Sequence, residues 1–210
     1  MKSAFIRYLM FSLALLALTE LTKYLLHFDK LIYNSLAENL SLSQIERFFK
    51  MQDKWKWLGY VFVPLFVFVK TIIIASVVYT GIFFFIKKPP TFKEIWNIVL
   101  KAEFIFLLVP ICKIVWFYFF QTNYKLEDLQ YFFPLSAINI TGYNGLESWL
   151  VYPLQSLNLF EFAYVIYLGY EIGKITQTNH DNGLKIMAYS YVPMMVLWVA
   201  VVMFLTLNNS

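Results

Sequence analysis

Two long apolar runs joined by a short basic hinge most strongly constrain how this chain can fold. The first run, residues 58–86, contains a single charged side chain, Lys70, and the second run covers residues 96–120. The hinge, residues 87–91, reads Lys-Lys-Pro-Pro-Thr. About 20 apolar residues are enough for a helix to cross the hydrocarbon core of a bilayer. The two runs therefore predict two membrane-spanning helices.

Composition supports a membrane protein. Hydrophobic residues make up 60% and charged residues 14% of the 210, whereas soluble domains carry about 25% charged residues. The net charge of +4 is small, so the chain shows no nucleic-acid footprint. The single cysteine, Cys112, excludes an intrachain disulfide and a cysteine-based metal site.

The chain reads as one all-α domain, residues 1–210, that forms a helical bundle in a membrane. The five predicted spans are residues 4–27, 58–86, 96–120, 158–175 and 185–206. The first span also resembles a signal peptide. Glu20 and Lys23 follow its apolar part in place of a small-residue cleavage site, which favours an uncleaved helix.

Two connections have features of their own. The tetrapeptide at residues 43–46 reads as a capping box that opens an amphipathic helix over residues 43–57. This helix could lie in the headgroup plane as an interfacial helix, or simply extend the second span. Residues 121–157 are apolar but interrupted by Pro134 and Pro153. They predict a partly helical cap at the membrane surface, with a re-entrant element as the alternative.

Lysine and arginine residues near the span ends predict the orientation. They collect before the first span, in the hinge and around the last connection, which all fall on one side of a five-span bundle. The positive-inside rule makes that side cytoplasmic, with the N-terminus inside and the C-terminus outside. Residues 28–57 are also basic and disagree with this assignment.

Charged residues inside the predicted spans are the candidate site residues, because such charges are costly in a membrane. At about 1.5 Å per residue, one group falls in the outer half of the membrane and the other in the inner half. The outer group is Glu20, Lys70, Lys113 and Glu161, and the inner group is Lys101, Glu103, Glu171 and Lys174. They either line a polar cavity or form structural ion pairs. Lys70, Glu103 and Lys113 are the hardest to explain as structural.

Catalytic motifs are lacking: the sequence contains no HExxH, no P-loop and no GxSxG. We therefore expect neither enzymatic activity nor a cofactor nor a metal site.

From the hinge onward the sequence resembles the Yip1 family of five-span membrane proteins. The residues that carry the resemblance are the 90–96 segment Pro-Thr-Phe-Lys-Glu-Ile-Trp, the 158–161 segment Asn-Leu-Phe-Glu and the glycine-closed segment 167–173. The similarity covers about residues 57–206 and implies a five-helix architecture. Eukaryotic members carry a long N-terminal region associated with Rab GTPases, and this chain has almost nothing before its first span.

These observations predict a non-enzymatic protein of a bacterial inner membrane that contacts lipid and a membrane-protein partner or a second copy of itself. The alternative is a small transporter or permease subunit whose polar path is lined by Lys70, Glu103 and Lys113.

Overall fold

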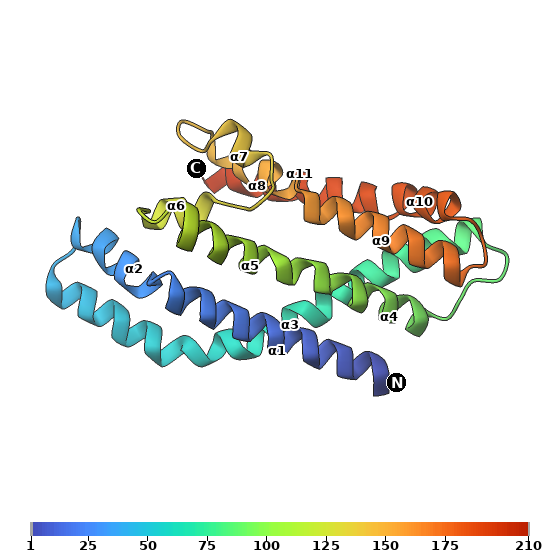
Figure 1. Cartoon of the computed structure of the whole chain (residues 1–210), viewed down its shortest axis with the longest axis horizontal. Coiled ribbons are helices and arrows are strands. Elements are labelled where there is room, and N and C mark those ends of the chain that lie inside the picture. Colours follow the sequence, from blue (N-terminus) through green and yellow to red (C-terminus); the bar gives the residue numbers. More distant parts are fainter. Residues whose placement is uncertain (1, 210) are drawn as a thin grey trace.

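The chain folds into a bundle of helices that run mostly along one long axis (Figure 1). The computed structural model describes residues 2–209. The α-helices are α1 (Lys2–Leu25), α2 (Phe28–Ala37), α3 (Leu42–Phe85), α4 (Phe92–Glu103), α5 (Leu108–Val115), α6 (Leu126–Tyr131), α7 (Ile138–Thr141), α8 (Ser148–Ser156), α9 (Leu159–Ile175), α10 (His180–Tyr189) and α11 (Tyr191–Asn209). A 3₁₀ helix, η1 (Phe104–Leu107), precedes α5, and a π-helix, η2 (Trp116–Phe120), follows it. The predicted all-α class is confirmed.

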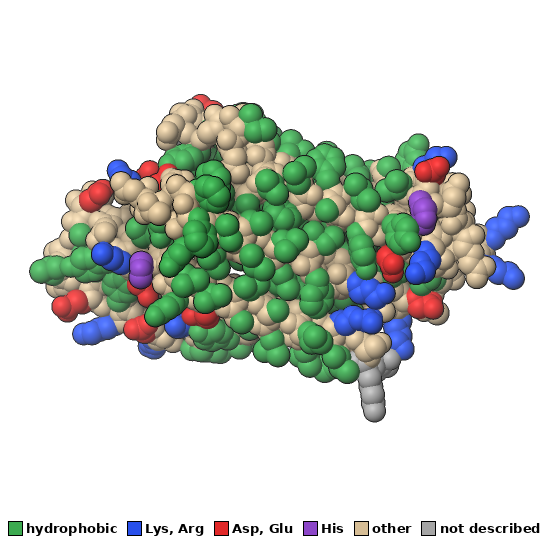
Figure 2. Space-filling view, viewed as in Figure 1, with side chains coloured by type: hydrophobic (Ala, Val, Ile, Leu, Met, Phe, Trp, Pro, Cys, Tyr) green, Lys and Arg blue, Asp and Glu red, His purple; other side chains and the backbone are tan. Residues whose placement is uncertain are grey.

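Three helical stretches are long and apolar enough to cross a membrane. They are Ser3–Leu25, Leu42–Phe85 and His180–Asn208, the last of which joins α10 and α11. They correspond to the first, second and fifth predicted spans. On the face shown in Figure 2, hydrophobic side chains cover the middle of the molecule and charged side chains gather at its two ends. This distribution matches a bundle whose middle lies in hydrocarbon.

The other two predicted spans are helical but shorter or less regular. The third is divided among α4, η1, α5 and η2. Pro110 explains part of this, because it lacks an N–H for the carbonyl of residue 106 and its ring crowds that carbonyl, so the preceding turn tightens to the 3₁₀ form. The fourth corresponds to α9, which has 17 residues.

The predicted interfacial helix is not a separate element. Residues 43–57 are the first part of α3, a continuous helix of 44 residues that extends about 66 Å at 1.5 Å per residue. The capping box also lies two residues earlier than predicted: Ser41 is the N-cap, and its backbone N–H donates to Oε1 of Gln44 at 2.9 Å. Residues 43–57 therefore extend the second predicted span and do not form a separate interfacial helix.

The main core lies where α3, α4, α9 and α10 meet. Its fully buried side chains include Val78, Ile82, Ala102, Leu168 and Ile172. Two buried polar side chains bond to residues of this cluster: Thr71 accepts from Trp96, and Glu103 accepts from Tyr164. The core is therefore mainly apolar but includes polar contacts.

Glycines allow α9 and α10 to pack backbone against backbone. A Cβ atom added to Gly183 of α10 would lie 1.9 Å from the carbonyl oxygen of Gly169 and 2.7 Å from the backbone nitrogen of Gly173. Small residues at helix contacts are the usual way for membrane helices to gain packing energy. The α9–α10 hairpin therefore depends on the absence of a side chain at Gly183.

We expect Gly183→Ala to destabilise the protein by about 3 kcal/mol, because neither backbone atom in its way can move without separating the helices. The matched control is Gly59→Ala in α3, where an added Cβ meets nothing within 4 Å. That change should be neutral or stabilise by up to about 1 kcal/mol through helix propensity. Thermal unfolding in detergent, followed by circular dichroism, measures both, and equal melting temperatures for the two variants would contradict the packing argument.

Candidate functional site

Lys70 of α3 and Glu103 of α4 form an ion pair inside the bundle. Lys70 Nζ lies 2.8 Å from Glu103 Oε2 and 4.6 Å from the centre of the Phe106 ring, where it makes a cation–π contact. Glu103 is 1% exposed, whereas 36% of the Lys70 side chain is exposed. A carboxylate this deeply buried requires a partner, because an unpaired charge there costs several kcal/mol.

Two tyrosines and a second carboxyl group extend this pair. The hydroxyl of Tyr164, on α9, donates to Glu103 Oε1 at 3.1 Å. One turn earlier on α9, Glu161 accepts a hydrogen bond from the hydroxyl of Tyr191, the first residue of α11. The rings of Tyr164 and Tyr191, whose centres lie 5.6 Å apart, connect the two halves. These five residues are called the polar cluster below.

Only half of a capping box forms at the start of α9. Asn158 is the N-cap of α9, and its side chain accepts from the backbone N–H of Glu161 at 2.8 Å. The Glu161 carboxyl does not return to the backbone of Asn158 and instead meets Tyr191. By contrast, the capping box at Thr91 closes fully, because its N–H donates to Glu94 Oε2 at 2.9 Å.

The remaining candidates lie apart from the polar cluster. Glu171 of α9 pairs with Lys101 of α4 at 3.5 Å. Glu20 of α1 pairs with Lys23 at 2.9 Å and Lys56 at 3.7 Å, and all three side chains are exposed. The charges thus form separate pairs and do not surround one common space.

Lys113 does not join Lys70 and Glu103. Its Nζ donates to the backbone carbonyls of Leu129 and Phe132. It therefore ties α5 to the segment of residues 121–157, called the cap segment below. Lys113 is thus bonded to the C-terminal end of α6 and shares no hydrogen-bond partner with Lys70 or Glu103 within residues 2–209. The path lined by these three residues stays a prediction.

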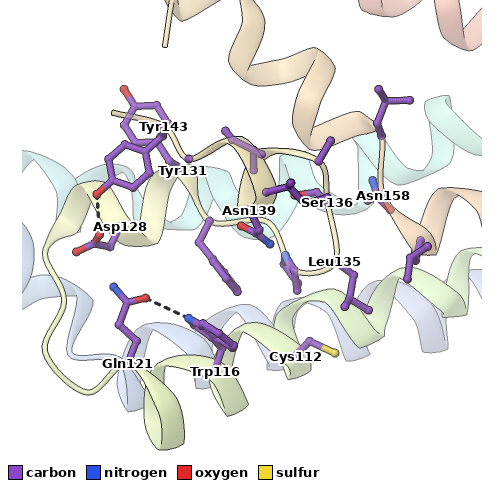
Figure 3. A pocket seen from close by; sticks show the side chains of 18 of the residues that line it. Cys112, Trp116, Gln121, Asp128, Tyr131, Leu135, Ser136, Asn139, Tyr143 and Asn158 are labelled. Atoms are coloured by element: carbon purple, nitrogen blue, oxygen red, sulfur yellow. Dashed lines mark hydrogen bonds between the residues drawn. The ribbon is translucent and has the colours of Figure 1, made fainter. Parts of the chain in front are cut away.

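A cavity of about 1030 Å³ lies between the cap segment and the bundle (Figure 3). Most of its lining is apolar, with Cys112 and Trp116 on the side of α5 and η2 and Leu135 among the cap residues. A few polar groups stand at its edge, including Gln121 and Asp128. Such a cavity could accept an apolar group, but none of the residues of the polar cluster line it.

A hydrogen bond between Tyr143 and Asp128 closes one side of the cap segment. The Tyr143 hydroxyl donates to Asp128 Oδ1 at 2.7 Å, and its ring stacks on Tyr131. This bond to Asp128 raises the pKa of Tyr143 to about 12. Partial burial alone would raise the pKa of Asp128, but hydrogen bonds from the Lys125 backbone and from Tyr143 hold it below the ordinary 3.8.

Sequence reasoning missed the tyrosines of the polar cluster. Tyr164 follows Glu161 by one helical turn, so its place on the same face of α9 was available as a signal. Tyr191 lies 30 residues from Glu161, and no local pattern connects them. Among residues 2–209, no three His, Cys, Asp or Glu side chains are grouped as metal ligands.

Searches of protein-family models, curated proteins and solved structures gave no match to this chain. The resemblance to the Yip1 family stays a prediction.

Replacing Lys70 and replacing Glu103 should lower the free energy of unfolding by different amounts. Lys70→Met leaves buried Glu103 without a counter-charge and should cost about 3 kcal/mol. Glu103→Gln should cost less, because the half-exposed Lys70 can extend its ammonium group towards polar surroundings. The double variant should recover most of the loss, since no unpaired charge remains.

Thermal unfolding in detergent supplies the double-mutant cycle. Lys23→Met, which removes an exposed partner of Glu20, is the control and should change stability by about 0–1 kcal/mol. Additive effects of the two cluster substitutions would show that the pair contributes nothing as a unit.

The cap hydrogen bond predicts two pH limits. A depressed pKa means that Asp128 stabilises the fold above pH 3.8 and that this contribution is lost as the pH falls through its folded value. The raised pKa of Tyr143 means a contribution present below pH 10.0 and lost as the pH rises towards about 12.

Wild-type protein and the Tyr143→Phe variant are each titrated with pH and followed by ultraviolet absorbance. The difference between the two curves isolates the ionisation of Tyr143. Its midpoint should be about 12 in wild type and should return towards 10.0 in an Asp128→Asn background. A midpoint unaffected by Asp128→Asn would mean that the two side chains are not bonded.

Proposed function

We propose that this chain is a non-enzymatic, five-span membrane protein that acts through helix and lipid contacts with a membrane-embedded partner or a second copy of itself. The five spans would be α1, the apolar part of α3, the run from α4 to η2, α9, and α10 with α11. The observation that carries the proposal is the pairing of the span charges. Lys70, Lys101 and Lys113 each bond to a different partner. This arrangement suits a structural bundle better than a transport path.

The surface available for contacts is apolar and extensive. Large exposed side chains follow α3 and α11, among them Phe62, Phe66, Trp198 and Phe204. Exposed apolar patches of this extent mark membrane or protein contact surfaces. Lipid covers most of them in the proposed bundle, and the partner would replace lipid over part of that surface.

The proposed orientation has the N-terminus inside and the C-terminus outside, in a bacterial inner membrane. The N-terminus, the basic hinge and the α9–α10 turn lie at one end of the molecule, and α7 and the C-terminus lie at the other (Figure 1). The positive-inside rule makes the first of these ends cytoplasmic. A Yip1-like protein would share this five-helix arrangement.

Chemical crosslinking in intact cells, followed by purification in mild detergent, tests the proposal. We expect one stoichiometric complex, either a homo-oligomer or a pair with a defined membrane protein, whose crosslinks lie on the exposed faces of α3 or α11. Phe66→Lys should weaken it, because a charge in a dry helix contact is costly. The control Lys88→Gln, in the hinge, should leave it intact. Recovery of a lone monomer without crosslinks in cells would overturn the proposal.

A transporter is the second candidate, favoured by one observation. More than a third of the Lys70 side chain is exposed although its partner Glu103 is almost fully buried, so the polar cluster has an open side. Reconstituted protein would then move protons or a small cation across vesicles, as read by an internal pH dye. Glu103→Gln would abolish that flux while the protein still folds, and a wild-type protein without flux would dismiss the candidate.

A further inference from the structure

The polar cluster contains more acidic groups than basic ones. Lys70 supplies one positive charge, and Glu103 and Glu161 supply two carboxyl groups. Lys70 is paired with Glu103 at 2.8 Å. Within residues 2–209, no Lys, Arg or His nitrogen lies within 4.0 Å of the Glu161 carboxyl. If both acids were ionised, the cluster would hold an uncompensated negative charge.

That charge would be costly at this position. Glu161 is the third residue of α9 and is half-buried. It is linked to Glu103 through two tyrosines: Tyr191 bonds to Glu161, Tyr164 bonds to Glu103, and the centres of the two tyrosine rings lie 5.6 Å apart. Like charges close together disfavour each other's ionised form. Two carboxyls that share one site with one cation commonly keep a proton on one of them. The total charge of the cluster is then zero.

The hydrogen bonds indicate which carboxyl holds the proton. Glu103 has the stronger support for a negative charge, because the Lys70 ammonium and the Tyr164 hydroxyl both donate to it. Glu161 Oε1 accepts from one neutral donor, the Tyr191 hydroxyl, and Oε2 has no hydrogen-bond partner within residues 2–209. Oε2 is therefore free to carry a hydrogen.

We propose that Glu161 is a proton-binding site, with a proton on Oε2 that balances the charge of the Lys70–Glu103 pair. The ionisable groups facing it are Lys70 from α3, Glu103 from α4, Tyr164 from its own helix and Tyr191 from α11. Tyr152 of α8 acts on Tyr191 from the cap side. Release of the proton places a second negative charge where α9 meets α11, so occupancy of the site alters the contact between these helices. This inference goes beyond the proposed partner contacts and does not depend on them.

Labelling with dicyclohexylcarbodiimide tests the site, because this apolar reagent modifies protonated carboxyl groups in apolar surroundings. The full-length protein is labelled in detergent over a range of pH, and peptide mass spectrometry locates the adduct. We expect the adduct on Glu161, with a yield that falls as the pH rises, and none on Glu147, an exposed carboxyl of the cap segment. Absence of the adduct on Glu161 at every pH would overturn the proposal.

The decisive variant is Glu103→Gln. It removes the competing acid, so Lys70 becomes free to pair with Glu161, which should then ionise. Labelling of Glu161 at neutral pH should fall about tenfold or more. Unchanged labelling would refute the charge-balance argument. Gel filtration confirms that the variant is folded.

Two further measurements distinguish other occupants and guard against a reagent artefact. Sodium ions at fixed pH should leave the labelling of Glu161 unchanged, and protection by sodium would mean that a metal cation, not a proton, occupies the site. Infrared difference spectra between acidic and alkaline pH should show a protonated carboxyl band that Glu161→Gln removes. A band that persists in Glu161→Gln would contradict the assignment.

Discussion

The lack of water around the middle of the molecule is the constraint on which the rest of the structure depends. In hydrocarbon each backbone polar group must find its partner within the protein, and helices meet that demand locally. The same constraint applies to charged side chains, which must be paired, neutralised or led to the surface. Lys70 and Glu103 are paired, with 2.8 Å between Nζ and Oε2. Lys113 illustrates another solution, because backbone carbonyls at the end of α6 accept from its ammonium group.

Irregular helix geometry occurs next to the polar cluster. Glu103 is the last residue of α4, and the 3₁₀ turn η1 begins immediately after it. Tyr191 is the first residue of α11, directly after the break at Ser190 that separates α10 from α11. The Ser190 hydroxyl donates to the carbonyl of Ile186 at 2.6 Å, and Pro193 offers no N–H to the turn before it. Two members of the cluster thus lie at helix ends, and its five side chains come from four helices, α3, α4, α9 and α11.

The helical class and the three long apolar helical stretches followed from the sequence because they depend on local properties. Hydrophobic run length identifies α1, α3 and α11, and Thr91 and Asn158 mark two helix starts by short-range capping. Partner choice depends on three-dimensional packing, and there the sequence was insufficient. Depth along the membrane grouped Lys113 with Lys70, but in the folded chain Lys113 donates to backbone carbonyls of the cap segment instead. The meeting of Glu161 and Tyr191 is likewise a property of how α9 and α11 pack.

The cap segment leads directly into α9, the helix that carries Glu161 and Tyr164 of the polar cluster. Its base is held by a short antiparallel bridge, in which the Ala137 N–H donates to the Leu157 carbonyl at 2.9 Å and the Leu159 N–H donates to the Leu135 carbonyl at 3.1 Å. The bridge includes Asn158, which caps α9 one turn before Glu161. A ligand that entered the cavity beneath the cap would contact Leu135 and Asn158 directly. The bridge therefore lies directly before the first turn of α9, which carries the cluster's least-compensated carboxyl group.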